Sequence, residues 1–76
     1  MTNLKFVWEF FGPDSKKLAQ HHLEHLNEFL KKENINSSES GISFESDNFS
    51  YSYTILDESM LEFIKTSLKP HKAFRL

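Results

Sequence analysis

Residues 42–55 read ISFESDNFSYSYTI, and this stretch decides the fold. Apolar and polar residues alternate on both sides of Asp47-Asn48, which is the pattern of strands with one buried face. Asp and Asn tolerate positive φ and therefore suit a two-residue hairpin turn. With that turn Phe44 pairs with Tyr51, so we expect the aromatic residues of both strands on one face of a sheet.

The segment before the hairpin predicts a strand followed by a long helix. Apolar and polar residues alternate over Leu4–Phe10, as in a half-buried strand. Gly12 and Pro13 break that strand, and either Gly12 or Asp14 can cap the helix that follows. Residues 15–33 place their apolar side chains on one broad stripe and their charged ones opposite, which indicates an amphipathic helix.

The segment after the hairpin predicts a second helix and a short strand. Asp57 is a favourable N-cap for a helix over residues 58–68, and Pro70 ends it. The tail, residues 71–76, alternates weakly and is a candidate for a last strand.

The resulting order is β-α-β-β-α with a short C-terminal strand, in one α+β domain over residues 1–76. This order is that of the ferredoxin-like, split β-α-β fold, an antiparallel sheet with two helices packed on one face. We expect the face under the helices to carry the aromatic residues Phe6, Trp8, Phe44, Tyr51 and Tyr53. We expect the open face to carry Lys5, Val7, Glu9, Ser43, Glu45, Ser50, Ser52 and Thr54.

Three of the four histidines, His21, His22 and His25, cluster in the first predicted helix. His22 falls on the apolar stripe, so we expect it at the core boundary, hydrogen-bonded to a strand tyrosine or to the backbone. His21 and His25 have the i, i+4 spacing that lets two imidazoles reach one metal ion. A third ligand would come from His71, from Glu24 or from a second chain; otherwise the pair belongs to a solvated helix flank.

The composition excludes several classes of function. The net charge is −2 and the lysines are interspersed with acids, so there is no basic footprint for nucleic acid. The expected burial of Tyr51 and Tyr53 also argues against an RNA-stacking sheet. There is no cysteine for disulfides or thiolate sites, and no apolar run long enough to span a membrane or direct secretion. We therefore expect a cytoplasmic protein that binds neither nucleic acid nor membrane.

These residues favour a small, non-enzymatic interaction or regulatory module whose specific function the sequence does not define. We expect its partner to be another protein or a second copy of this chain, bound through the open sheet face or an edge strand. No nucleophile can be assigned and no cofactor motif occurs, so we expect no enzyme activity, no cofactor and no small-molecule ligand. The alternative is a metal- or pH-responsive protein that uses the helix flank of His21 and His25. The fold by itself implies no function.

Overall fold

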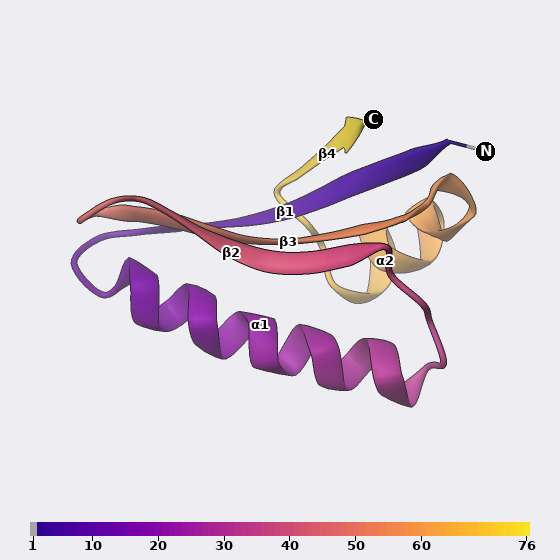
Figure 1. Cartoon of the computed structure of the whole chain (residues 1–76), viewed down its shortest axis with the longest axis horizontal. Coiled ribbons are helices and arrows are strands. Elements are labelled where there is room, and N and C mark those ends of the chain that lie inside the picture. The colour runs from indigo at the N-terminus through magenta and orange to yellow at the C-terminus, as the bar shows by residue number, and fades with distance from the viewer. Residues whose placement is uncertain (1) are drawn as a thin grey trace.

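The computed structural model describes residues 2–76 and shows a four-stranded antiparallel sheet with two helices on one side (Figure 1). The strand order is β2-β3-β1-β4, and each neighbouring pair of strands is antiparallel. The small α+β architecture predicted from the sequence is therefore confirmed. The elements are β1 (Asn3–Phe11), α1 (Ser15–Lys32), β2 (Glu39–Ser46), β3 (Phe49–Asp57), a 3-10 turn (Glu58–Met60), α2 (Leu61–Ser67) and β4 (Lys72–Arg75).

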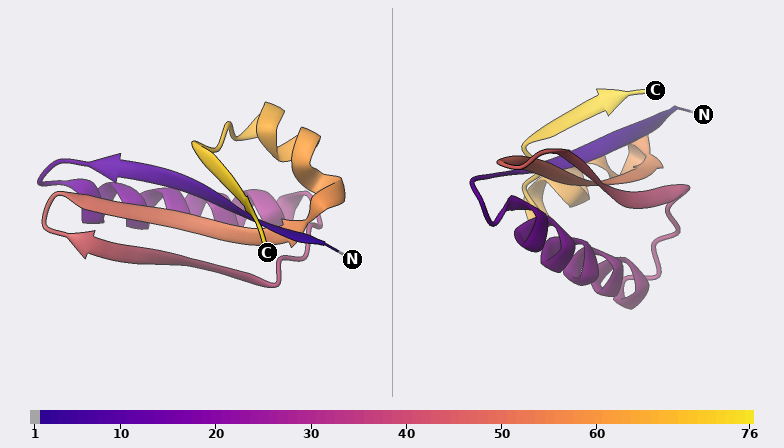
Figure 2. Two further views of the ribbon diagram at one scale, coloured as in Figure 1. Left: turned by 90° about the horizontal axis from the view of Figure 1, so that it is seen from above. Right: turned by 60° about the vertical axis from the view of Figure 1, so that its left-hand side comes forward.

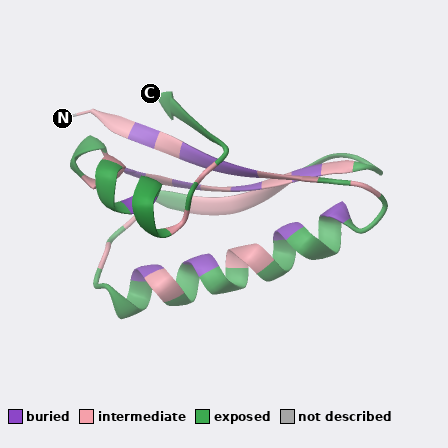
Figure 3. Ribbon diagram, turned by 180° about the vertical axis from the view of Figure 1, so that it is seen from behind, coloured by how far each residue is buried: buried purple, intermediate pink, exposed green. Residues whose placement is uncertain are grey.

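The core lies between the sheet and the two helices. From β1 it takes the inward-facing side chains of the predicted alternation, Leu4, Phe6 and Trp8. Leu26 and Leu30 of α1 and Ile64 of α2 pack on them. The buried residues of α1 form a stripe on the side that faces the sheet, and the opposite side is exposed (Figure 3).

The two helices begin in different ways. Gly12 has a φ of 104°, which favours glycine, and its carbonyl accepts from the Ser15 amide as α1 begins. Asp14 occupies the N-cap position of α1 without a side-chain cap bond. Asp57 does act as the predicted cap, because its carboxylate accepts from the Ser59 amide. The predicted helix over residues 58–68 is a 3-10 turn followed by the shorter α2.

The pairing between β2 and β3 corrects the predicted register. The two-residue turn at Asp47-Asn48 is present, and Ser46 pairs with Phe49 across it. Glu45 is an extra residue, a β-bulge, so Phe44 pairs with Ser50 instead of Tyr51. Since side chains alternate along a strand, one inserted residue exchanges the faces of the remaining pairs.

The faces of β3 are therefore the reverse of those predicted. Tyr51 and Tyr53 pair with Glu9 and Val7 of β1 and lie on the open face, away from the helices. The other side chains of the strand point inward, and all of them are buried: Ser50, Ser52, Thr54 and Leu56. Of the expected open face, Lys5, Val7, Glu9 and Ser43 lie there and the three hydroxyl residues do not.

Three hydroxyl groups are accommodated under α1 because each has a hydrogen-bond partner. Ser50 contacts Ser15 at 3.4 Å, Ser52 contacts His22 at 2.8 Å, and Thr54 contacts Ser40 at 2.8 Å. Within residues 2–76, every buried side-chain nitrogen and oxygen has a hydrogen-bond partner. The desolvation cost of an unpaired hydroxyl is thus avoided, and a partly polar strand can lie against the core.

The predicted C-terminal strand is present as β4, which pairs with Leu4–Val7 at the edge of the sheet. The indole nitrogen of Trp8 donates to the Leu68 carbonyl at 2.9 Å, which fixes the end of α2 beside β1. The last strand is short and its residues are exposed. No helix within residues 2–76 has the length and apolar character needed to cross a membrane.

Replacing Thr54 by Val tests the buried hydroxyl row. The variant keeps the shape of the side chain but leaves the Ser40 hydroxyl without this partner. We expect the free energy of unfolding, measured in urea, to fall by about 1–2 kcal/mol. The matched control is Thr66→Val on the exposed side of α2, which should change it by less than about 0.5 kcal/mol. Equal effects of the two variants would contradict the role given to Thr54.

Candidate functional site

The candidate site is the face of the sheet that no helix covers. In Figure 2, α1 runs behind the strands, and the side of the sheet turned away from it is open. Alternate residues of three strands meet there: Phe49, Tyr51 and Tyr53 of β3, Lys5, Val7 and Glu9 of β1, and Lys72 and Phe74 of β4. Together with Glu39 and Ser43 of β2, these residues form the open face.

An aromatic row runs along β3 on the open face. Neighbouring ring centroids are 6.3 Å apart for Phe49 and Tyr51 and 6.2 Å apart for Tyr51 and Tyr53. Phe11 stacks on Phe49 at 4.9 Å and extends the row to the end of the sheet. The ammonium group of Lys5 lies 4.5 Å from the centre of the Tyr53 ring, a cation–π contact. The row is therefore held in place by neighbouring rings and by this lysine.

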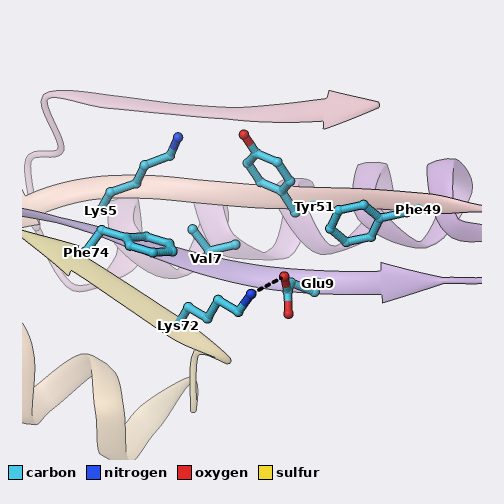
Figure 4. A pocket seen from close by; sticks show the side chains of 7 residues that line it. All are labelled: Lys5, Val7, Glu9, Phe49, Tyr51, Lys72 and Phe74. Atoms are coloured by element: carbon cyan, nitrogen blue, oxygen red, sulfur yellow. Dashed lines mark ion pairs between the residues drawn. The ribbon is translucent and has the colours of Figure 1, made fainter. Parts of the chain in front are cut away.

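A shallow pocket of about 210 Å³ lies beside the row, between β3 and β4 (Figure 4). Val7 forms its floor and is only 4 % exposed although it is on the open side of the sheet. Glu9 and Lys72 form an ion pair of 3.0 Å at its rim. Pockets for drug-sized ligands span roughly 300–1,000 Å³, so this one suits a single side chain better than a free small molecule. Its lining residues are Lys5, Val7, Glu9, Phe49, Tyr51, Lys72 and Phe74.

The charges of this surface differ between its two sides. Glu39 and Glu45 lie along β2, whereas the two lysines belong to β1 and β4. The ammonium group of Lys5 reaches over the Tyr53 ring of β3, and that of Lys72 pairs with Glu9 of β1. Glu39 accepts a hydrogen bond from the Tyr53 hydroxyl, and this bond raises the pKa of Tyr53 above its ordinary value. The carboxylate of Glu45 accepts from the Ser43 hydroxyl. The β2 side of the surface is thus acidic, and the lysines come from the other two strands, where Glu9 neutralises Lys72.

His22 is a structural residue at the core boundary, as predicted, but its partner differs from those expected. Its Nδ1 contacts the Ser52 hydroxyl at 2.8 Å, and its ring lies 4.9 Å from that of Trp8. Burial, and then the charges of His25 and His71, lower the pKa of His22. Ser52 is fully buried, so this serine–histidine pair cannot present a nucleophile to a substrate.

The predicted metal candidates, His21 and His25, lie together on the exposed flank of α1. Their Nε2 atoms are 3.3 Å apart and their ring centroids 4.7 Å apart. His71, considered as a third ligand, lies elsewhere, where its Nδ1 accepts from the Glu9 amide at 2.8 Å. Residues 2–76 contain no group of three or more histidine or acidic side chains arranged to hold a metal ion.

Sequence reasoning missed the aromatic half of the open face. Two signals were available in the residues themselves. Leu56 is apolar and is expected to face the core. Because side chains alternate along a strand, Thr54, Ser52 and Ser50 then face the core as well. His22, a polar residue in the middle of an apolar stripe, requires a polar group opposite it in the sheet, and Ser52 supplies that group.

No family model, no curated protein and no solved structure matches this chain. The chemistry of its own surfaces therefore carries the functional argument.

Replacing His22 by Gln tests the lowered pKa. Because burial lowers the pKa of the folded state, the unfolded chain takes up a proton at higher pH than the folded chain does. Neutral His22 contributes its full stabilisation above a pH of about 6.5, the ordinary histidine pKa. This contribution is lost as the pH falls through the pKa of the folded state. We expect His22→Gln, which does not titrate, to lose less free energy of unfolding over the acid range in urea titrations.

The matched control is His21→Gln, which removes an exposed ring on the same helix and should keep the native acid slope. An acid slope in His22→Gln as steep as that of the native protein would show that His22 is not buried in its neutral form.

Proposed function

We propose that this chain is a non-enzymatic interaction module that associates with a second copy of itself through the open face. The observation that carries the proposal is an uncovered aromatic row with opposite charges on its two sides. Apolar area, charge and shape each support this association.

The first support is the amount of apolar surface left uncovered. The rings of Phe49, Tyr51 and Tyr53 are partly exposed, and Phe74 and Phe11 are 49 % and 68 % exposed. Contiguous apolar patches of this kind, with charged groups around them, mark association surfaces. A chain of 76 residues also has a small core, so covering this surface would add stability that the monomer lacks.

The second support is charge complementarity in a two-fold dimer. A two-fold axis parallel to the strands lays β2 of one copy over β4 of the other, and β3 over β1. Glu39 then lies near the partner's Lys5, because both residues occupy the same row across the sheet, opposite Ile55. Opposite charges face each other at both ends of the interface, which favours this arrangement.

An axis perpendicular to the strands is disfavoured on two grounds. It would reverse the strand direction and bring Glu39 close to the partner's Glu45, where like charges repel. It would also leave β4 without a counterpart, since β4 pairs only with the Leu4–Val7 half of β1. The parallel axis covers β4 and avoids the repulsion.

The third support is the pocket beside the aromatic row. With β3 over β1 of the partner, Tyr53 comes to the same row as the partner's Val7, which is the floor of that pocket. Aromatic residues that fill a pocket at the centre of an interface contribute most of its binding energy. By symmetry each copy offers one such ring and one such pocket.

The ferredoxin-like assignment of the fold is part of the same proposal. The strand order β2-β3-β1-β4, with β3 antiparallel to both of its neighbours and an α-helix between β1 and β2, supports it. We propose a cytoplasmic location on the basis of the sequence, which has no cysteine for the disulfides that stabilise many small secreted domains.

Single-stranded nucleic acid is a second type of occupant for an aromatic sheet, since bases stack on such rings. The surface here disfavours it, because Glu9, Glu39 and Glu45 stand beside Lys5 and Lys72. Binding to phosphates draws its affinity from clustered cations, and acids that outnumber the lysines oppose it. Tight binding of a labelled oligonucleotide to the open face would replace the self-association proposal.

The test of the proposal is sedimentation equilibrium over about 1 µM to 1 mM, the range of weak to moderate dissociation constants. We expect a concentration-dependent dimer, and Tyr53→Ala should weaken it by about 30-fold, as loss of a central aromatic residue does. The matched control, Leu18→Ala, removes an exposed apolar side chain of α1 and should leave the dimer intact. A native chain that stays monomeric throughout would overturn the proposal.

A charge exchange tests the direction of the axis. Lys5→Glu and Glu39→Lys should each weaken the dimer by about tenfold or more, because like charges then face each other. The double variant Lys5→Glu/Glu39→Lys restores an opposite-charge pair across the interface and should recover most of the loss. Additive weakening in the double variant would rule out the axis parallel to the strands.

A further inference from the structure

The exposed flank of α1 carries a pair of imidazoles that the open face does not use. His21 and His25 are one helical turn apart, both are exposed, and their Nε2 atoms converge to 3.3 Å. α1 packs on the other side of the sheet from the open face, so this pair is separate from the proposed dimer interface (Figure 1).

We propose that His21 and His25 together chelate one transition-metal cation of the Zn²⁺, Ni²⁺ or Cu²⁺ class through their Nε2 atoms. Zinc–imidazole bonds are about 2.0–2.1 Å, and tetrahedral angles then separate two ligating nitrogens by about 3.3–3.4 Å. The observed separation of 3.3 Å is this distance. The helix thus presents both donor atoms at the spacing that one metal ion requires.

The type of donor selects the class of cation. Neutral imidazole suits zinc, copper and nickel, whereas calcium and magnesium take oxygen ligands. The nearest carboxylates in the sequence, Glu24 and Glu28, do not form a third ligand with this pair, since residues 2–76 contain no three-residue metal cluster. Water completes the coordination, and the site is open and exchangeable, unlike a closed structural zinc site.

The pair also differs from a chance contact between two exposed rings. Two neutral imidazoles at this distance share one N–H hydrogen between their Nε2 atoms. A metal ion can replace this hydrogen and bind both nitrogens. Chelation gains from the fixed spacing, because the second imidazole binds at high effective concentration once the first has bound. A flexible pair on a loop would lack this advantage, and the helix supplies it.

The test is a titration of the full chain with zinc chloride, followed by calorimetry and by the ring ¹⁵N signals of all four histidines. We expect one zinc per chain, with the Nε2 signals of His21 and His25 shifting together while those of His22 and His71 stay in place. His21→Ala and His25→Ala should each lower the affinity by about 100-fold or more, since each removes the chelate.

The matched control is Glu24→Gln, which removes a charge from the same helical turn and keeps both imidazoles. It should change the affinity by less than about fivefold, the effect of one exposed charge. The far-UV spectrum of each variant checks that α1 is intact, which is expected because all three positions are exposed. Zinc affinity that survives in both alanine variants, or a shift centred on His71, would overturn the proposal.

Discussion

The structure depends on the row of hydroxyl groups that β3 turns toward α1. Ser50, Ser52 and Thr54 are completely buried, and each has its own partner: Ser15 and His22, both of α1, and Ser40 of β2. Burying three unpaired hydroxyls would cost several kcal/mol in total, so this orientation of β3 is stable only with all three partners present. The bulge at Glu45 sets the register in which β2 and β3 meet this requirement.

When the hydroxyl side chains of β3 face the core, the remaining side chains of the strand must face away from the helices. The rings of Phe49, Tyr51 and Tyr53 are forced onto the open face by the alternation of side chains along a strand. The core is then built mainly from β1 and the helices, around Phe6, Trp8, Leu26 and Ile64. The same constraint that places polar groups inside thus creates the apolar surface outside, and the proposed self-association follows from it.

The sequence predicted the elements well because each has a local signal. The alternation of β1, the apolar stripe of α1, the Asp47-Asn48 turn and the short last strand all appear as expected. The orientation of β3 could not be obtained in the same way. Aromatic and hydroxyl residues alternate along this strand, so the alternation fits either face toward the core. Aromatic residues are the usual choice for the buried face. The orientation of β3 is set by a one-residue bulge and by three side-chain hydrogen bonds between residues distant in the sequence. The pattern of residues within one strand does not predict either of them.

The most direct test of this account is an isotope-filtered nuclear Overhauser experiment on a mixture of labelled and unlabelled chains, which detects contacts between copies only. We expect cross-peaks between the ring of Tyr53 in one copy and the methyl groups of Val7 in the other. Within a single chain, the same rings should show contacts to Lys5 and none to Leu26 or Leu30. Cross-peaks from the tyrosine rings to those leucines would contradict the orientation of β3, and the absence of any contact between copies would contradict the association through the open face.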